Sequence, residues 1–177
     1  MKTLLLPASI FILSLVLHSC STEGIESPAE YKVSDKTKKI LTTNKPLSAY
    51  NHEYKTRDAI LGISSDWDAI ATDTSRNFDS LTVQKLDELI AGKFIDPDKS
   101  YHGAPTPREF LDFMITHPAL TLHGYAGNPT RQDYRISLRG LYVNSTLTNP
   151  MMKKDFQQFC EEADSLYTEN VLYSRWD

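Results

Sequence analysis

The feature that most constrains the fold of this 177-residue chain is a change of hydrophobic period in its second half. Over residues 120–125, and again over 134–139, apolar and polar side chains alternate one by one, and the second run continues to Val143. Residues 127–130, Gly-Asn-Pro-Thr, are rich in turn formers and separate the two runs. Strict alternation is typical of strands with one buried face, so the two runs predict an antiparallel hairpin.

Before the hairpin, apolar residues recur at helical spacing. This spacing predicts a helix over about 56–74, with a break near Gly62. A second helix is expected to start after Asp79 or Ser80 and to end at Gly92 in a left-handed turn.

The clearest helix start in the sequence is a capping box. Thr106 caps, Pro107 fits the first turn and Glu109 completes the box, which predicts a helix that ends at His117. After the hairpin, the apolar stripe predicts the longest helix, over about 149–170, and the C-terminal Trp176 is expected to pack back on the domain.

These elements define the expected fold class. Two strands alone are marginal, whereas helices packed on one face stabilise them. We therefore expect an α+β fold, with about four helices packed on a small antiparallel sheet that contains the β-hairpin. A third strand is expected from residues 47–50.

The N-terminal segment has the three parts of an export signal. Lys2 supplies a positive start, residues 4–17 form a short apolar stretch, and Ser19 is a small residue before a cleavage point. The apolar run is too short for a membrane span, which needs roughly 20 residues.

Leu17-His18-Ser19-Cys20 resembles the lipobox of bacterial lipoproteins, with His18 departing from the small or apolar residue preferred there. The resemblance implies that the peptide is cut before Cys20, and that this cysteine carries a diacylglyceryl group and an acylated amine. Ser21 follows in place of an Asp, which implies the outer membrane rather than retention at the inner one. A plain secretory signal and an uncleaved signal anchor are the alternatives.

The chain therefore divides into a lipoprotein signal peptide (1–19), a lipidated Cys with a polar tether (20–54) and a single globular α+β domain (55–177). The tether is inferred because residues 21–54 are polar and sustain no apolar period. If Cys20 is lipidated, Cys160 has no partner for a disulfide, and the core must supply the stability.

The motifs of common chemistries are absent from the sequence. It contains no phosphate loop, dinucleotide fingerprint, zinc helix or nucleophile elbow, so we expect no cofactor and no metal. Residues 96–107 are superficially similar to a calcium loop but lack its sixth-position glycine. Because 23 acidic residues outnumber 19 basic ones without a basic block, nucleic acid is not an expected partner. Cys160 is expected to be a buried, inert thiol, and His102, His117 and His123 match no metal motif.

The polar face of the hairpin is the candidate binding site. Alternation and the adjoining turn group six residues there: His123, Tyr125, Arg131, Arg135, Ser137 and Arg139. Arginines and a tyrosine suit carboxylate or phosphate groups, or an acidic protein surface. No general acid and base pair is visible, so binding is favoured over turnover. An ordinary solvated sheet face is the alternative.

Three function classes follow. We expect a membrane-anchored cell-envelope lipoprotein that acts as a non-enzymatic binding module for a protein or an envelope polymer with acidic groups. An immunity or inhibitor lipoprotein against an envelope-acting toxin or hydrolase is a narrower alternative, because an inhibitor needs no active site. A small envelope enzyme that uses His102 or His123 with an Asp is the third.

Overall fold

The computed structural model of the chain describes residues 30–43, 47, 49–68, 71 and 73–177. These described residues form five α-helices, one 3-10 helix and five strands. In chain order they are α1 (Asp35–Thr42), α2 (Tyr54–Leu61), β1 (Ser75–Leu81), α3 (Val83–Ala91), α4 (Pro107–Thr116), β2 (Thr121–Gly127), β3 (Ile136–Asn144), η1 (Ser145–Leu147), α5 (Pro150–Phe159), β4 (Ser165–Tyr167) and β5 (Val171–Arg175). The α+β class predicted from the sequence is confirmed.

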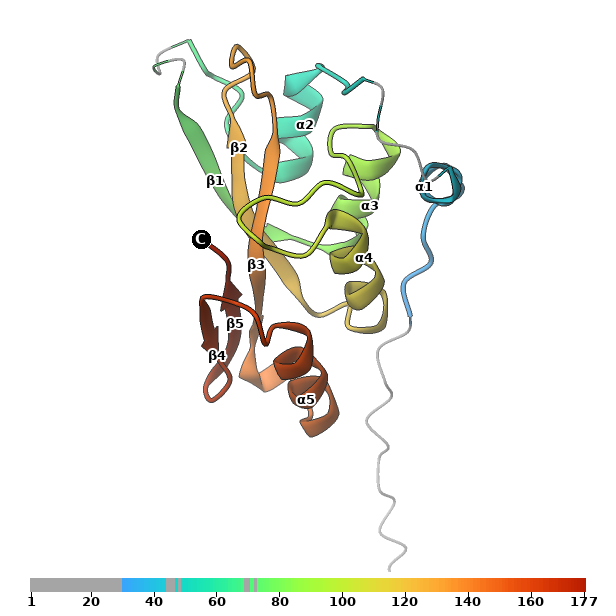
Figure 1. Cartoon of the computed structure of the whole chain (residues 1–177), viewed down its shortest axis with the longest axis vertical. Coiled ribbons are helices and arrows are strands. Elements are labelled where there is room, and N and C mark those ends of the chain that lie inside the picture. The colour runs from blue at the N-terminus through green and yellow to red at the C-terminus, as the bar shows by residue number, and fades with distance from the viewer. Residues whose placement is uncertain (1–29, 44–46, 48, 69–70, 72) are drawn as a thin grey trace, which may run out of the picture.

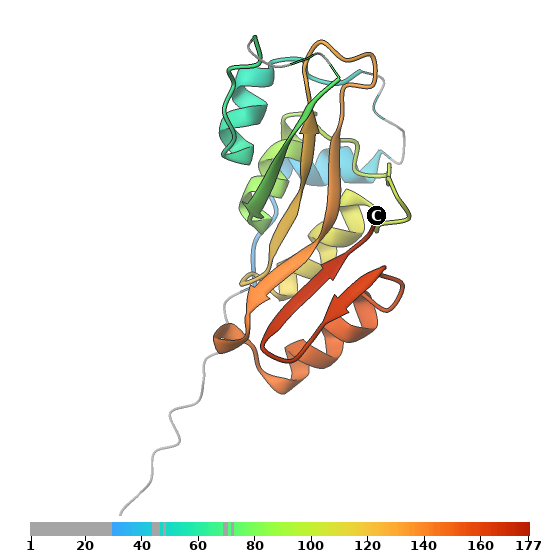
Figure 2. The ribbon, with the colours of Figure 1, turned by 90° about the vertical axis from the view of Figure 1, so that its left-hand side faces the viewer.

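The strands form one antiparallel sheet in the order β1-β2-β3-β5-β4. The predicted hairpin is confirmed as β2 and β3, but the sheet around it is larger than expected. Figure 1 shows the described helices on one face of this sheet. In Figure 2, which is turned by 90°, the other face points toward the viewer and the strands lie in front of the helices. Among the described residues, none of the helices has the length and apolar character to cross a bilayer.

A bulge in β3 interrupts the alternation that the sequence predicts up to Val143. Leu122 pairs with Leu141 and Gly124 with Leu138, so β3 carries one residue more than β2 beside His123. Leu138 and Leu141 therefore both face the core although they are three residues apart, and neither is more than 4% exposed.

Helices α3 and α4 bury the stripes that their spacing predicts, and the capping box of Thr106 with Glu109 is confirmed. The start of α3 differs, because Asp79 and Ser80 belong to β1 and Thr82 is the cap. Gly92 is not left-handed; the positive φ of 59° falls on Lys93.

The helix expected over 56–74 is shorter. It ends at Gly62, whose φ of 72° closes the last turn, and the following described residues 63–68 are not helical. Trp67 explains the difference, because its indole N–H donates to the buried carboxylate of Asp58 at 2.6 Å and folds the segment back on α2. Residues 69, 70 and 72 of that expected helix lie outside the described residues.

The long helix expected over 149–170 is wrong in its second half. α5 ends at Phe159, and the residues beyond it form the hairpin of β4 and β5. In β5 the side chains follow period two, with Leu172 and Ser174 buried and Tyr173 half-buried between them. The prediction that Trp176 packs back is confirmed, since it is 3% exposed and its backbone N–H donates to the carbonyl of Arg139 at 2.7 Å.

The expected tether over 20–54 also differs where the structure describes it. Residues 30–43 contain α1, which packs on α3, and Thr37 is fully buried. The described residues 47, 49 and 50 form no strand, and the sheet ends at β1 instead. Residues 20–29 of the expected tether lie outside the described residues.

The carboxylate of Asp87 in α3 holds this N-terminal segment. It accepts hydrogen bonds from the Tyr31 hydroxyl at 3.0 Å and from the Ser34 backbone N–H and hydroxyl, both at 2.9 Å. Burial, reinforced by the hydrogen bond to Asp87, raises the pKa of Tyr31 to about 12. Burial alone would raise the pKa of Asp87, but the hydrogen bonds from Thr37, Ser34 and Tyr31 outweigh it and lower that pKa.

We predict that Asp87→Asn lowers the free energy of unfolding at pH 7 by about 1–3 kcal/mol, because the amide replaces an ionised acceptor of three hydrogen bonds. Since the pKa of Asp87 is lowered in the fold, its contribution is present above the unfolded value of about 4 and is lost as the pH falls through the folded value. Urea unfolding of both proteins should therefore show a difference that shrinks in acid.

Glu88→Gln is the matched control, because Glu88 is the exposed neighbour of Asp87 on α3. It should change stability by less than about 0.5 kcal/mol. An equal effect of the two substitutions would show that Asp87 does not hold residues 30–43 to the domain.

Candidate functional site

The sheet face that the described helices leave uncovered, called the open face below, carries most of the side chains that the sequence selects. The half of this face next to the β2–β3 turn, which is the upper half in Figure 1, contains Tyr125 near the end of β2. The Tyr125 hydroxyl accepts a hydrogen bond from Arg135 Nη2 at 2.9 Å. The guanidinium carbons of Arg135 and Arg139 lie 5.7 and 6.0 Å from the centre of its ring. The structure therefore brings Tyr125, Arg135 and Arg139 together.

The loop between α3 and α4 adds two residues that the sequence does not single out for this face. The guanidinium carbon of Arg135 lies 4.8 Å from the ring centre of Tyr101. His102, whose φ is 59°, brings its Nε2 to 3.0 Å from the Tyr125 hydroxyl. Stacking between aromatic rings fixes the plane of a guanidinium and leaves its edge for hydrogen bonding. The sequence positions of Tyr101 and His102 give no signal for this role, because the role depends on how the loop between α3 and α4 folds.

Two of the six predicted residues do not present their polar groups on the open face. Arg131 lies in the β2–β3 turn, where its Nε is 2.6 Å from the Asp133 carboxylate and its Nη1 donates to the Asp73 carbonyl. Ser137 pairs with Tyr125 across the hairpin but is fully buried. Arg131 therefore braces the turn, and the Ser137 hydroxyl is not available at the surface.

The lower half of the open face carries a row of three tyrosines. Tyr142 of β3 pairs with Tyr173 of β5, which pairs with Tyr167 of β4. Tyr142 is 39% exposed and Tyr167 62% exposed. The sequence does not predict this row, because Tyr167 falls within the helix expected over about 149–170. The alternation over 171–175 is the signal that could have revealed it.

His123 joins the two halves of the open face. Its ring stacks on Tyr173, with 5.1 Å between ring centres and an interplanar angle of 3°, and its Nε2 donates to the Ser174 carbonyl at 2.8 Å. Burial lowers the pKa of His123, and the nearby charges of Arg175 and Arg139 lower it further. The imidazole is therefore neutral at pH 7, and its Nε2 proton is committed to the backbone.

A hollow of about 740 Å³ lies on this face between β1, β2, β3 and β5. Its charged lining residues are Asp79, Arg139 and Arg175. Arg175 Nε lies 2.7 Å from a carboxylate oxygen of Asp177, and Arg139 Nη2 pairs with the same oxygen. Two guanidinium groups thus converge on one carboxylate, and the hollow falls within the size range of small-ligand sites.

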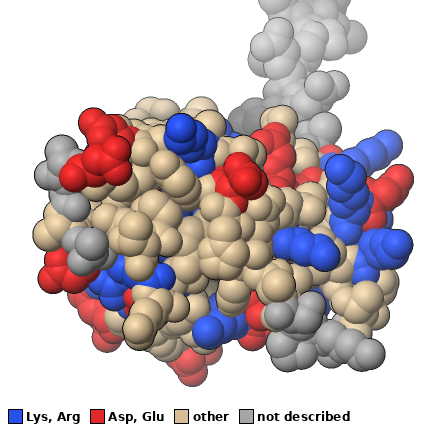
Figure 3. Space-filling view, turned by 90° about the horizontal axis from the view of Figure 1, so that it is seen from above, with Lys and Arg blue, Asp and Glu red and all other residues tan. Residues whose placement is uncertain are grey.

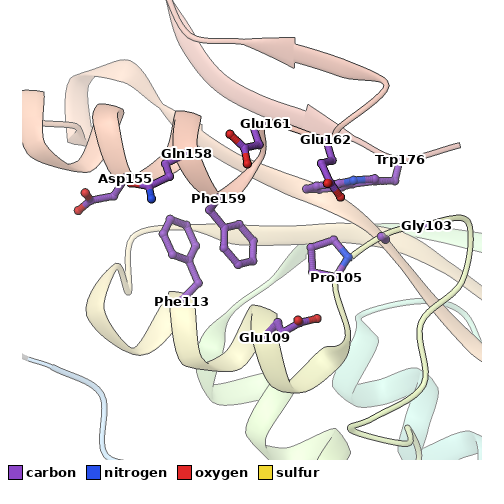
Figure 4. Close-up of a pocket in the computed structure, with 11 residues that line it drawn as sticks. Gly103, Pro105, Glu109, Phe113, Asp155, Gln158, Phe159, Glu161, Glu162 and Trp176 are labelled. Carbon is purple, nitrogen blue, oxygen red and sulfur yellow. The ribbon is translucent and has the colours of Figure 1, made fainter.

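A second groove lies between α4 and α5 and carries the opposite charge. Figure 4 shows the rings of Phe113 and Phe159 next to each other among its lining residues, with Trp176 at one side. The two phenyl rings are stacked, with centres 4.2 Å apart. Its charged lining residues are all acidic: Glu109, Asp155, Glu161 and Glu162. An anionic partner is therefore disfavoured in this groove.

The other candidate chemistries are not assembled. Arg108 donates two hydrogen bonds to the Asp98 carboxylate, and the Asp96 carboxylate accepts hydrogen bonds from backbone N–H groups. The carboxylates of the loop that resembles a calcium site are therefore bound by other groups of the protein. His117 lies 3.5 Å from Asp155, away from His102 and His123. Among the described residues, no group of three or more possible ligands could hold a metal ion.

Comparisons with known proteins do not assign the chain to a family. No family of proteins, no curated protein and no solved structure gives a match to it.

Cys160 is buried, as expected, although it lies at the end of α5 rather than within it. Burial raises its pKa to about 12. We predict that a soluble thiol reagent at pH 8 labels Cys160 at least about a hundredfold more slowly in the folded protein than in guanidinium chloride, because the thiolate is both rare and inaccessible. Fast labelling of the folded protein would contradict the core assignment and restore Cys160 as a candidate nucleophile.

Proposed function

We propose that this chain is a lipid-anchored lipoprotein of the cell envelope, attached through Cys20, and that it is a non-enzymatic binding module. Its open face would bind a protein or an envelope polymer that carries acidic groups, and the outer membrane is the proposed location. The observation that carries the binding part is the convergence of Arg139 and Arg175 on the carboxylate of Asp177 beside the tyrosine row.

The Asp177 contact supports a carboxylate as the preferred group. Guanidinium and carboxylate groups form charge-assisted hydrogen bonds that are about twice as strong as neutral ones. The Asp177 side chain is 49% exposed, so solvent reaches it and a partner's carboxylate can compete for the same arginines. Arginine and tyrosine are also the residues that dominate binding energy at protein interfaces.

The distribution of charge supports this choice of face. The groove between α4 and α5 is lined by carboxylates, which repel an acidic partner. At the upper end of the molecule, Figure 3 shows both basic and acidic side chains, with a group of basic ones at the right-hand side. We assign the attraction of an acidic partner to the arginines on the open face, where they lie beside exposed tyrosines, rather than to the exposed lysines of α1.

Binding is better supported than turnover. His123 and Asp79 both line the hollow, but the Nε2 proton of His123 is held by the Ser174 carbonyl. His102 contacts the Tyr125 hydroxyl instead of a carboxylate. A hydrogen-bonded His-Asp pair, which the enzyme alternative needs, is therefore not among the contacts of these two histidines.

An immunity or inhibitor lipoprotein is the second candidate, and the tyrosine row favours it. Three tyrosines that are neighbours across strands, two of them well exposed, provide flat contact area that costs little side-chain entropy. Such a surface can block an envelope-acting toxin or hydrolase without any catalytic group. Inhibition of such a toxin or hydrolase by the purified protein would distinguish this function from general binding of acidic partners.

The anchor gives the first test. We predict that Cys20→Ala moves the protein from the membrane fraction to the soluble or unprocessed pool, because two or three acyl chains are lost together. Cys160→Ala, which removes the other cysteine, should leave the protein in the membrane fraction. If Cys20→Ala remains acylated and fractionates with membranes like the parent, the lipoprotein proposal is wrong.

The open face gives the second test. Arg135→Glu with Arg175→Glu should weaken binding to poly-glutamate about tenfold at low salt, because both changes reverse charges on the open face. Arg139 is left in place because its Nε also donates to the Trp176 carbonyl at 3.2 Å. Fluorescence titration at low and moderate salt measures the effect, which should shrink as salt screens it.

The control is Lys36→Glu with Lys39→Glu, two exposed lysines of α1 whose replacement changes the net charge equally. It should weaken binding far less. Equal losses for the two variants would mean that poly-glutamate senses net charge and not the open face. No loss in either variant would remove the open face as the binding site.

A further inference from the structure

Two large apolar side chains at the lower end of the molecule are mostly exposed to solvent. Leu147 of η1 is 63% exposed and Met151 in the first turn of α5 is 73% exposed. They lie four residues apart at the point where β3 passes through η1 into α5. Exposed leucine and methionine side chains placed together indicate an interaction site when a suitable partner is near.

The two lysines near this pair do not stabilise the helix. Lys153 and Lys154 follow Met152 in α5, and neither forms an ion pair with a described residue. The N-terminus of a helix carries a partial positive charge, so lysines there are slightly unfavourable, whereas acidic residues would be favourable. Apolar side chains flanked by lysines are instead typical of surfaces that lie in a membrane interface.

The chain enters the described domain at this same end. The backbone N–H of Tyr31 donates to the carbonyl of Ile115 in the last turn of α4, and His117, just beyond α4, lies 3.5 Å from Asp155 of α5. Figures 1 and 2 both show the described chain beginning in the half of the molecule that holds α5, far from the β2–β3 turn. Nine residues lie between Cys20 and Glu30, so the two ends of this segment are at most about 35 Å apart when it is fully extended.

We propose that this end, formed by η1 and the first turn of α5, rests on the bilayer that holds the anchor. Leu147 and Met151 would enter the interface, and Lys153 and Lys154 would lie near the lipid phosphates. The inference rests on the lipid anchor proposed above. It adds an orientation, with the open face standing along the membrane normal and the β2–β3 turn pointing away.

The test uses the full-length lipidated protein, extracted in detergent and reconstituted in phosphatidylcholine–phosphatidylglycerol vesicles that contain a nitroxide-headgroup lipid. An environment-sensitive fluorophore is placed on Thr146→Cys in η1 or on Gln132→Cys in the distant turn, both exposed positions. Burial of Cys160 and acylation of Cys20 keep the natural cysteines from reacting. β3 alone separates the two probes by roughly 27 Å, well beyond contact with the same headgroups.

We expect the probe at residue 146 to be quenched severalfold more strongly than the probe at 132. Leu147→Ser with Met151→Ser should reduce quenching at 146 to the level at 132, because the apolar contact is lost while the anchor remains. Leu147→Met with Met151→Leu, which keeps the apolar area, should retain the difference. Circular dichroism confirms that the variants are folded, since all of these side chains are exposed.

Two outcomes overturn the inference, and they differ in what they say about the anchor. If the protein floats with the vesicles but both probes are quenched equally, the orientation is wrong and the anchor stands. If the protein does not float with the vesicles, the anchor fails and the orientation fails with it.

Discussion

The arrangement of the sheet depends on the absence of a side chain at Gly140. A Cβ atom there would lie 1.9 Å from the carbonyl oxygen of Ser174 and 2.5 Å from His123 Nε2. Because Gly140 has none, β5 and the imidazole of His123 both approach β3 at the bulge. The same approach brings Tyr173 under His123 and Arg175 toward Arg139. The hollow on the open face is thus a consequence of one close backbone contact.

A buried ion pair fixes the opposite end of the sheet. Arg57 and Asp58 of α2 are fully buried, and Arg57 Nε donates to Asp58 at 2.7 Å. Arg57 Nη1 donates to the Gly127 carbonyl at 3.0 Å, and Trp67 donates to Asp58, so the pair joins α2, the following loop and the end of β2. A buried pair adds little net stability compared with apolar packing, but removing one partner leaves a buried charge unpaired. Its evident role is to set where the β2–β3 turn begins.

Local signals in the sequence predict the parts of the fold that local interactions determine. The capping box of α4 and the alternation of β2 and β3 fall in this group, because backbone hydrogen bonds and one buried face decide them. The C-terminal hairpin does not, since apolar residues over 149–170 fit a helical stripe equally well, and only pairing with β3 selects the strand. α1 is not predicted from the sequence for a similar reason. Its polar segment is held by Asp87, fifty residues further along the chain, and no local pattern reports such a contact.

In the candidate site, too, some features follow from local sequence signals and others depend on contacts between distant segments. Alternation is enough to place Tyr125 and Arg135 on one face. Alternation also places Arg139 there, whereas the bulge decides which residues beyond Arg139 reach this face, and a loop distant in sequence supplies Tyr101 and His102. Ser137 shows the limit of alternation, which predicts the face of a residue but not whether neighbouring side chains cover it.

The proposed orientation bears on which partner each half of the open face serves. β3 runs from the β2–β3 turn to η1, so the tyrosine row lies nearer the proposed bilayer contact than the arginines around Tyr125 do. In the proposed orientation, a polymer rooted in the same membrane would meet the tyrosine row and Arg175 first. A protein partner arriving from the aqueous side would meet Arg135 first, where salt-dependent steering would act before contact. The two partner classes therefore make different demands on one surface, and the half that binding requires distinguishes them.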